Sequence, residues 1–436
     1  MNDPGQTPAS YWAATAAPLS PGIEGFEGNE QADVVIVGAG FTGLTTGLHL
    51  AERGVDVLVI DANEPGWGAS GRNNGQVVAA LKHEPHEIEE AFGTERGKKL
   101  IEAIGQAPDM VFGIIARYGI QCDAKRNGII TAAHSPNALL NLQKRTDVWR
   151  SRGAPLSMLP RNEMADRTGT TYYLGGSYDP RGGAINPLAY ARGLAGAVLS
   201  AGGRLRSDAR VTRIVRSGGR HILELAKGTI SAGKIIIATN AYTDDLWPGL
   251  KKTFIPVRTP QLVSKPLPLG SLATILPSGE IMSDLRKLMF GVRIQPGNRL
   301  HLGGGGGTSG ADREGSYRNM VRLCCQVFPF LPDMEWEYRW TGFMAMTPDF
   351  YPRLFELAPG IAACLGYSGR GIGTATLLGQ ELAKWASDTT RIDELVLPLS
   401  HYRELPYYPF KEILVETAIK YYDARDRLVH ALSHGR

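Results

Sequence analysis

The chain has 436 residues, and 53 of them are glycine, well above the roughly 7% of average usage. Hydrophobic residues make up 43% and charged residues 21%, and glycine has no three-residue period, so the composition excludes disordered and collagen-like chains. At roughly 100–200 residues per domain, the length predicts two or three domains. The glycine excess indicates either a loop-rich protein or a backbone that must approach a ligand closely at several places.

The charge and the cysteines exclude further classes of protein. The net charge of +4 comes from 47 basic and 43 acidic residues, a balance that argues against nucleic acid as a partner. No secretory signal or transmembrane segment is expected, because the longest apolar runs are only strand-sized. Cys122, Cys324, Cys325 and Cys364 form no CxxC pair, so we expect buried, reduced thiols. These features predict a soluble, cytoplasmic protein.

The N-terminal part of the chain predicts a leader followed by a βαβ unit. Residues 1–30 are rich in Ala, Pro and Gly, and we expect them to lie over the surface, partly anchored by Tyr11 and Trp12. The elements predicted next are a buried strand at 33–37, a helix at 44–53 and a second buried strand at 55–60. Parallel strands joined in this way imply a right-handed crossover.

The turn between the first strand and the helix has a GxGxxG pattern. Gly38 permits the tight turn, Gly40 lets the backbone approach a pyrophosphate, and Gly43 lets helix and strand pack closely. The helix N-terminus offers N–H groups and a partial positive charge to phosphates. Asp61 ends the second strand, where an acidic residue can accept hydrogen bonds from a ribose. The predicted dinucleotide contacts are Gly38, Gly40, Phe41, Thr42, Gly43, Asp61 and Ala62.

Three further segments favour FAD over NAD. Residues 66–76 are loaded with small residues and carry Ser70 and Arg72, which suit phosphate oxygens. Residues 234–240 form a buried strand that ends in small polar residues. Residues 366–374 form a second glycine-rich turn before a helix, whose N-terminus would stabilise negative charge on a reduced flavin. The cofactor contacts predicted in and beside these segments are Ser70, Arg72, Asn73, Asn74, Gly75, Gln76, Val211, Thr239, Asn240, Gly369, Arg370, Gly371, Ile372 and Gly373.

The remaining pattern alternates helices and strands. The other predicted helices lie at 90–125, 187–201, 374–386 and 411–432, and strands are expected at 210–215, 221–226, 362–367 and across 250–340. Acidic residues interleave with the basic ones in the last helix, so we expect it to pack on the body of the protein rather than on a membrane.

Taken together, these segments resemble the FAD-dependent amine and amino-acid oxidases of the D-amino-acid oxidase superfamily. Within it, the chain is similar to the gamma-glutamylputrescine oxidases. The most specific matching motif is the Gly-Ala-Ser-Gly-Arg-Asn block at 68–73. The other matching segments lie at 32–43, 299–305, 340–342, 347–349, 366–373 and 406–410.

The resemblance implies an α/β fold, α+β overall, with two domains. One is a Rossmann-like FAD-binding domain built from discontinuous segments, and the other is a substrate domain with a mainly antiparallel sheet. The implied boundaries are a leader at 1–30, the FAD-binding domain at 31–90, 187–247 and 341–400, the substrate domain at 91–186 and 248–340, and a C-terminal helical tail at 401–436.

The resemblance also implies a reaction. An amine or amino acid (a secondary amine, an N-substituted amino acid or a glutamylated polyamine) would be oxidised at its C–N bond to an imine by hydride transfer to flavin N5, with oxygen or another acceptor taking the electrons. Non-covalent FAD is expected, because residues 343–346 contain no Cys and residues 70–72 no His. No metal is expected.

Three other functions stay open. One is a cyclic imino-acid oxidase or dehydrogenase, for a substrate such as pipecolate or proline, that passes electrons to a carrier. Another is a flavin-binding subunit without activity. An NAD-dependent dehydrogenase is the weakest alternative, because it leaves the second glycine-rich turn unexplained.

No catalytic acid or base stands out, and the substrate contacts are predicted from position. Lys82 and His83 follow the flavin-lining segment, and solvent exposure is the alternative for both. Arg293 can bind a carboxylate or form a structural ion pair. Trp340 and Tyr367 can form pocket walls or belong to the core. The run Gly303–Gly307 is longer than the family's two or three glycines, and no role for it follows from the sequence.

Overall fold

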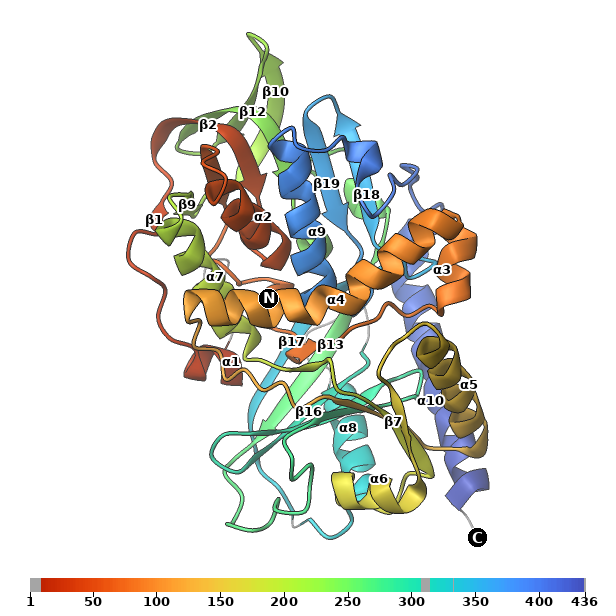
Figure 1. The fold of residues 1–436 in the computed structure, drawn as a ribbon. Helices are drawn as coiled ribbons and strands as arrows, with labels where there is room; N and C mark the ends of the chain where they lie inside the picture. The colour runs from red at the N-terminus through yellow and green to blue at the C-terminus, as the bar shows by residue number, and fades with distance from the viewer. Residues whose placement is uncertain (1–8, 307–313, 332, 435–436) are drawn as a thin grey trace.

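The computed structural model describes residues 9–306, 314–331 and 333–434. Within these residues the chain forms a nine-stranded sheet, called here the mixed sheet, and an eight-stranded sheet, called here the antiparallel sheet. The mixed sheet lies in the upper half of Figure 1 and the antiparallel sheet in the lower half. A short pairing of β4 (Gln76–Val77) with β8 (Gly183–Ala184) completes the strand pairs.

The centre of the mixed sheet is parallel, as the apolar runs predict. β2 (Gly28–Val37) pairs in parallel with both β3 (Val57–Ile60) and β12 (Gly228–Ile237), and β12 pairs in parallel with β19 (Ile361–Leu365). The outer strands are β1 (Glu24–Gly25), β9 (Arg204–Ser207), β10 (Val211–Ser217), β11 (Arg220–Leu225) and β18 (Arg353–Ala358). Strands buried on both faces are typical of a sheet covered on each side.

Helices cover one face of the mixed sheet (Figure 1). They are α2 (Phe41–Ala51), α4 (Thr94–Tyr118), α7 (Pro187–Ser200) and α9 (Gly371–Ala386), and they share one hydrophobic core with the sheet. The predicted boundaries place α4 in the substrate domain, but this helix packs against α9 in that core.

The antiparallel sheet has the strand order β17-β13-β16-β15-β14-β5-β7-β6. Its strands are β5 (Ile129–Ala133), β6 (Ser157–Leu159), β7 (Gly175–Asp179), β13 (Ile255–Ser264), β14 (Ile281–Asp284), β15 (Phe290–Gln295), β16 (Arg299–Gly304) and β17 (Trp336–Met346). All pairs are antiparallel except β14 with β5. β17 continues past residue 340, where the predicted boundary would end the substrate domain. The helices α5 (Pro136–Ser151), α6 (Arg161–Thr168) and α8 (Glu314–Val327) pack beside this sheet.

Two local features differ from the sequence predictions. The helix expected over 90–125 is two helices, α3 (Pro85–Phe92) and α4, separated at Gly93, whose φ of 81° ends the first helix. The predicted anchoring of the leader is confirmed, because Tyr11 and Trp12 are buried in α1 (Tyr11–Thr15). Cys325 is exposed on α8, whereas the other three cysteines are buried, as expected.

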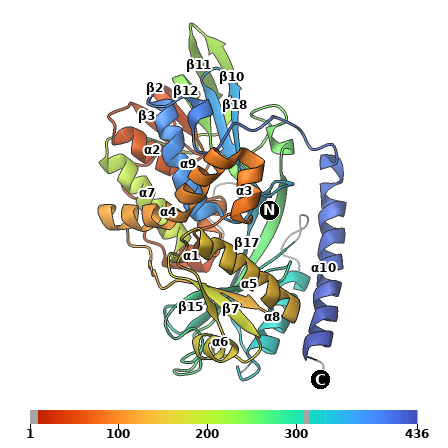
Figure 2. The same cartoon turned by 45° about the vertical axis from the view of Figure 1, so that its right-hand side comes forward.

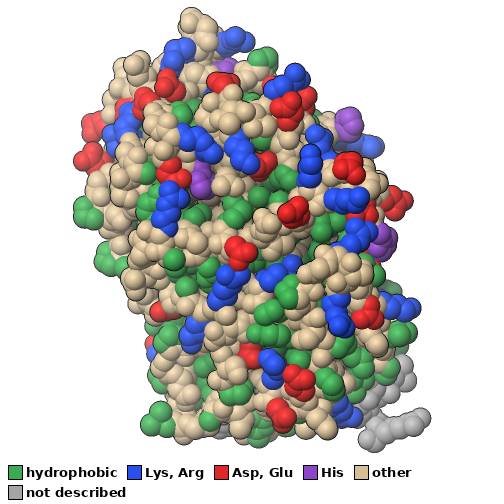
Figure 3. Space-filling model, viewed as in Figure 1, with side chains coloured by type: hydrophobic (Ala, Val, Ile, Leu, Met, Phe, Trp, Pro, Cys, Tyr) green, Lys and Arg blue, Asp and Glu red, His purple; other side chains and the backbone are tan. Residues whose placement is uncertain are grey.

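The C-terminal helix α10 (Lys411–His434) runs along one side of the molecule, from the level of the mixed sheet to that of the antiparallel sheet (Figures 1 and 2). An ion pair of 3.6 Å between Arg322 and Asp423 ties it to α8. No helix within the described ranges is long and apolar enough to cross a membrane. On the face in Figure 3, basic and acidic side chains are interspersed.

Candidate active site

A cavity of about 780 Å³ lies where the two sheets meet. Its lining comes from the carboxyl ends of the central parallel strands, from segment 67–76, from the turn before α9, from the antiparallel sheet and from α10. The carboxyl end of a parallel sheet is where ligands bind in open α/β folds.

The first glycine-rich turn leaves no room for side chains. A Cβ on Gly38, whose φ is 112°, would lie 2.9 Å from the Ala238 carbonyl oxygen. A Cβ on Gly43 would lie 1.9 Å from the Gly38 carbonyl oxygen, so helix and strand pack as closely as the pattern predicts. Ser70 Oγ accepts the Phe41 N–H at 2.9 Å and thereby fixes segment 67–76 over the start of α2.

Asp61 organises the same turn from the end of β3. Its carboxylate accepts the Ala39 N–H at 2.7 Å and the Asn63 N–H at 2.9 Å. Burial raises the pKa of Asp61 to about 6, against the lowering by those backbone donors and by Arg210. Because the carboxylate also lines the cavity, it can accept further hydrogen bonds from a ligand there.

Arg72 is held behind the cavity wall instead of lining the cavity. Its Nε donates to the Trp67 carbonyl oxygen at 2.7 Å, and its guanidinium carbon lies 4.3 Å from the centre of the Trp67 ring. Trp67 and Tyr242 line the cavity and pack edge to face at 5.6 Å. The sequence analysis did not predict either aromatic residue, because an aromatic residue in a small-residue loop carries no distinctive spacing.

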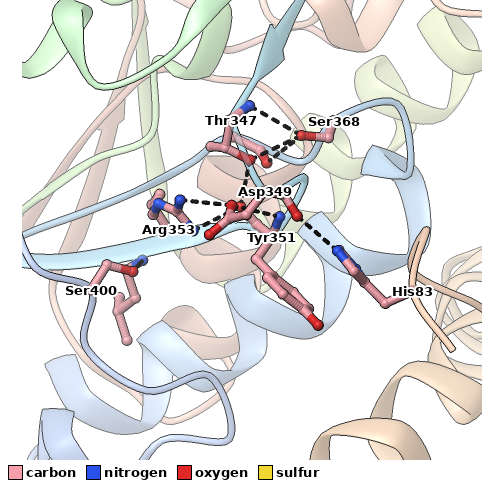
Figure 4. Close-up of polar contacts among 9 residues, drawn as sticks. His83, Thr347, Asp349, Tyr351, Arg353, Ser368 and Ser400 are labelled. Carbon is pink, nitrogen blue, oxygen red and sulfur yellow. Dashed lines mark hydrogen bonds and ion pairs between the residues drawn. The ribbon is translucent and has the colours of Figure 1, made fainter. Parts of the chain in front are cut away.

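The second glycine-rich turn is braced by hydroxyl groups (Figure 4). Ser368 has a φ of 49° and its Oγ lies 3.2 Å from Thr347 Oγ1. Asn240 Oδ1 accepts the Gly366 N–H at 2.9 Å, which joins this turn to the end of β12. The second glycine-rich turn therefore lies beside the first one at the end of the parallel strands, although the two are far apart in the sequence.

Most of the predicted cofactor contacts meet in this cavity. The predicted residues that line it are Gly38, Gly40, Phe41, Thr42, Asp61, Ala62, Ser70, Asn73, Asn74, Gln76, Val211, Thr239, Asn240, Gly369, Arg370, Gly371 and Ile372. Four predicted contacts lie outside the lining, namely Gly43, Arg72, Gly75 and Gly373. Gly43 and Gly75 contact backbone instead, since a Cβ on Gly75 would lie 2.2 Å from the Ile185 carbonyl oxygen.

Two of the predicted substrate contacts, Lys82 and Tyr367, line the cavity. The other three lie outside its lining. His83 stacks on Tyr351 with ring centres 3.6 Å apart and donates from Nε2 to the Asp349 carbonyl oxygen at 2.7 Å (Figure 4). Burial lowers the pKa of His83, so this ring is neutral at pH 7.

Arg293 and Trp340 lie behind the lining. Arg293 is 4% exposed and donates to two backbone carbonyl oxygens, of Asn74 and Ile185, each at 2.9 Å. Trp340 is 2% exposed, and its indole N–H donates to the Arg72 carbonyl oxygen at 3.0 Å. Both side chains are thus occupied by backbone groups of segment 67–76 and its neighbours.

One end of the cavity is cationic. Lys82, Lys287 and Arg370 line it and lie close enough for Arg370 and Lys287 to lower the pKa of Lys82, after burial as the main cause, to about 8. Burial lowers the pKa of Arg370 to about 10, so it stays charged. The acidic residues of the described lining are Asp61 and Asp244, and both interact with Arg210, which also lines the cavity.

The wall beside this cationic end is apolar and comes from α10. Its inward residues are Leu414, Val415, Ala418, Ile419 and Tyr422. Phe350 and Met289 extend the apolar surface, and Lys82 Nζ lies 4.6 Å from the Phe350 ring centre. The cavity therefore offers charge for an anion beside an apolar surface.

Comparison with known proteins identifies the family. The family described as FAD dependent oxidoreductase matches residues 33–385. This chain belongs to that family. It is therefore an FAD-dependent oxidoreductase, and its relatives act on amines or amino acids.

The relatives of this chain match most of its length. The gamma-glutamylputrescine oxidoreductase of Escherichia coli (strain K12) is 31% identical over 429 residues, which cover 96% of this chain and 98% of that protein. Glycine oxidase of Geobacillus kaustophilus (strain HTA426) is 26% identical over 80% of this chain and 90% of that protein. The crystal structure of glycine oxidase from Geobacillus kaustophilus has the same fold, with a TM-score of 0.72, 23% identity, and 86% of this chain and all of that chain covered.

The residues that line the cavity of this oxidoreductase fit FAD. The carboxamide of Asn74 lines the cavity, and both its Nδ2 and its Oδ1 are buried without a protein partner. Gln76 Nε2 is buried without a partner in the same wall. Buried polar groups are nearly always hydrogen-bonded, so these atoms are available to hydrogen-bond with groups of a bound ligand. With the glycine turns and Asp61, they form a site for a long, polar cofactor.

Proposed function

We propose that this FAD-dependent oxidoreductase oxidises the C–N bond of an amine that also carries a carboxylate, such as an N-substituted amino acid or a glutamylated amine, to an imine. FAD, when bound, would supply the acceptor for the hydride that the carbon beside the nitrogen loses. Water then hydrolyses the released imine to a carbonyl compound and an amine. The cationic end formed by Lys82, Lys287 and Arg370 is the observation that carries this proposal.

The cationic end serves both binding and reactivity. A carboxylate gains charge-assisted hydrogen bonds from Lys82 and Arg370. The same positive charges disfavour an ammonium group nearby, and the apolar wall of α10 adds a desolvation cost. Both effects lower the pKa of the substrate amine, and the neutral amine is the form that can lose a hydride.

FAD is proposed to be bound without a covalent link. No Cys or His occurs among the described residues that line the cavity, and His83 is engaged with Tyr351 and Asp349 outside it. Precipitation of the purified protein with acid is expected to leave all the yellow colour in the supernatant. Colour that stays with the precipitated protein would overturn this part of the proposal.

Anaerobic reduction of the flavin by paired compounds tests the substrate class. In each pair one member carries a carboxylate that the other lacks, for example N-methylglycine against dimethylamine, and gamma-glutamylputrescine against putrescine. We expect the carboxylated member of at least one pair to bleach the flavin and its partner without a carboxylate to leave it oxidised. Bleaching by the partners alone would contradict the substrate class, and no bleaching by any amine would favour a flavin-binding subunit.

The electron acceptor is tested in the same preparations. Turnover in air with stoichiometric hydrogen peroxide identifies an oxidase. Turnover only with an artificial dye acceptor identifies a dehydrogenase that passes electrons to a carrier.

A further inference from the structure

Three consecutive backbone carbonyls of segment 72–74 each accept a hydrogen bond from a distant side chain. Trp340 Nε1 donates to the first at 3.0 Å, Trp12 Nε1 to the second at 2.9 Å and Arg293 Nη1 to the third at 2.9 Å. The donors come from β17, α1 and β15, which are far apart in the sequence. Three separate parts of the fold therefore fix the backbone of one short segment.

The donors support one another. The rings of Trp12 and Trp340 pack edge to face with centres 6.0 Å apart, and the Arg293 guanidinium carbon lies 5.3 Å from the Trp12 ring centre. All three side chains are at most 4% exposed. We call these three residues the carbonyl clamp.

Burying the Arg293 guanidinium in this clamp costs free energy. It forms no ion pair with any residue that the structure describes, and burial lowers its pKa to about 10. A buried guanidinium without a carboxylate is costly unless its N–H groups are satisfied. Both of its hydrogen bonds come from Nη1, to two backbone carbonyl oxygens, and they fix the position of residue 74, whereas its Nε is buried without a partner.

The clamp fixes the backbone beside one side chain, that of Asn74, which has no hydrogen-bond partner within the described protein. Asn73 is occupied, because its Nδ2 donates to the Ala69 carbonyl oxygen and its Oδ1 accepts the Gly75 N–H. Asn74 has both carboxamide atoms buried without a partner, and it lines the cavity. A Cβ on Gly303 would lie 2.1 Å from Asn74 Nδ2, so the carboxamide rests against a bare backbone of the antiparallel sheet.

We propose that Trp12, Trp340 and Arg293 are positioning residues that hold the Asn74 carboxamide as a hydrogen-bonding group for the isoalloxazine part of bound FAD. A carboxamide is both donor and acceptor, and the polar edge of an isoalloxazine presents both kinds of partner. The proposal depends on FAD binding, which the family establishes, and not on the substrate proposed above.

Single variants measure the effect of each donor. Trp340→Phe and Trp12→Phe keep a buried aromatic ring but remove the N–H together with part of the ring volume, and Asn74→Ala removes the carboxamide itself. Trp149→Phe is the matched control, because Trp149 is 3% exposed and its indole nitrogen has no hydrogen-bond partner. The readouts are the FAD dissociation constant of the apoprotein, the flavin midpoint potential and the melting temperature.

We expect Asn74→Ala and Trp340→Phe each to weaken FAD binding by about tenfold and to move the midpoint potential in the same direction, as loss of a buried hydrogen bond predicts. Trp149→Phe is expected to lower the melting temperature alone. If Trp340→Phe changes only the melting temperature, as the control does, the clamp is merely structural and the proposal is overturned.

The double variant Trp340→Phe/Asn74→Ala tests whether the clamp acts through Asn74. We expect it to match Asn74→Ala in FAD affinity and midpoint potential, because residues that act through one another are not additive. Fully additive changes would overturn the proposal. Arg293→Lys keeps one donor and is expected to retain more FAD affinity than Arg293→Met. If the Arg293 variants do not fold, the comparison of Trp340→Phe, Asn74→Ala and their double variant still tests the proposal.

Discussion

The hydroxyl groups of Thr42 and Tyr367 lie 2.5 Å apart and join two glycine-rich turns that are 325 residues apart in the sequence. Thr42 belongs to the first turn of α2, and Tyr367 stands just before α9. Both residues line the cavity, and burial raises the pKa of Tyr367 well above its usual value, so the phenol stays protonated and can donate. The pairing brings two helix N-termini to one ligand.

Tyr367→Phe is expected to lower the free energy of unfolding of the apoprotein by about 1–2 kcal/mol, because it removes this bond and leaves the Thr42 hydroxyl without that partner. It is also expected to weaken FAD binding, since both turns line the cavity. Urea unfolding and FAD titration measure the two effects. Thr42→Val is the companion variant, and the double variant should lose little more than either single one. Additive losses would show that the two hydroxyls act independently.

The nucleotide half of the site could be predicted from the sequence because its chemistry depends on local spacing. The glycines at 38, 40 and 43, the carboxylate of Asp61 and the second glycine-rich turn are each encoded within a few residues. Their positions relative to parallel strands follow from the βαβ unit. The central strands β2 and β3 were predicted for the same reason, with bounds that differ by a few residues.

The cationic end of the cavity and its α10 wall could not be predicted in the same way, because they are assembled from distant segments. Arg293 looks like a carboxylate ligand in the sequence, but its partners are backbone carbonyls more than 100 residues away. Lys287 and the inward face of α10 have no motif that marks them, yet they line the cavity. A side chain's partner across two sheets is a property of packing, which local periodicity does not encode.

The glycine run at the end of β16 is visible in the sequence, but its role depends on side chains from distant segments. Gly303 and Gly304 end the strand and Gly305 and Gly306 line the cavity, whereas Gly307 lies outside the described residues. A Cβ on Gly303 would lie 2.7 Å from Gln261 Oε1 as well as 2.1 Å from Asn74 Nδ2. The run therefore leaves space for two carboxamides at the cavity wall, a role that no sequence pattern predicts.

Gly303→Ala is expected to displace these two carboxamides and to weaken FAD binding by about tenfold or more. Because the clashing atoms are the ends of side chains, the loss in melting temperature should be modest. Gly113→Ala in α4 is the control, since its Cβ would point into open space and alanine favours helix. Unchanged FAD affinity in Gly303→Ala would contradict the role given to Asn74.

Asp61 is expected to make FAD binding depend on pH. Its pKa of about 6 in the apoprotein means that the carboxylate becomes protonated as pH falls through about 6. If the charged form accepts hydrogen bonds from the cofactor, the dissociation constant of FAD rises as pH falls from 7 to 5, and FAD binding releases a proton there. Fluorescence titration measures the constant. Asp61→Asn should bind FAD more weakly with a flat profile, whereas Asp244→Asn should keep the parent's slope.

Lys82 is expected to impose a pH limit on anion binding. Its pKa of about 8 means that it carries charge below pH 8 and loses it as pH rises through about 8. The dissociation constant of a short-chain carboxylate without an amine should therefore rise about tenfold between pH 7 and 9. Perturbation of the flavin spectrum reports this binding. Lys82→Met should bind weakly at every pH, and Lys82→Arg should bind with little change up to pH 9. A parent protein with a flat profile would contradict this role.

The inner face of α10 is expected to select substrates, and two neighbouring tyrosines provide a matched pair. Tyr422 lines the cavity, whereas Tyr421 is 62% exposed on the outside of the same helix. Tyr422→Ala widens the cavity beside the cationic end, so it should change the ratio of kcat/KM for a long and a short carboxylated amine by about fivefold or more, through the contact area it removes. Tyr421→Ala removes the same side chain with the same gain in helix propensity and should leave that ratio unchanged. Equal effects of the two substitutions would show that α10 stabilises the fold without contacting the substrate.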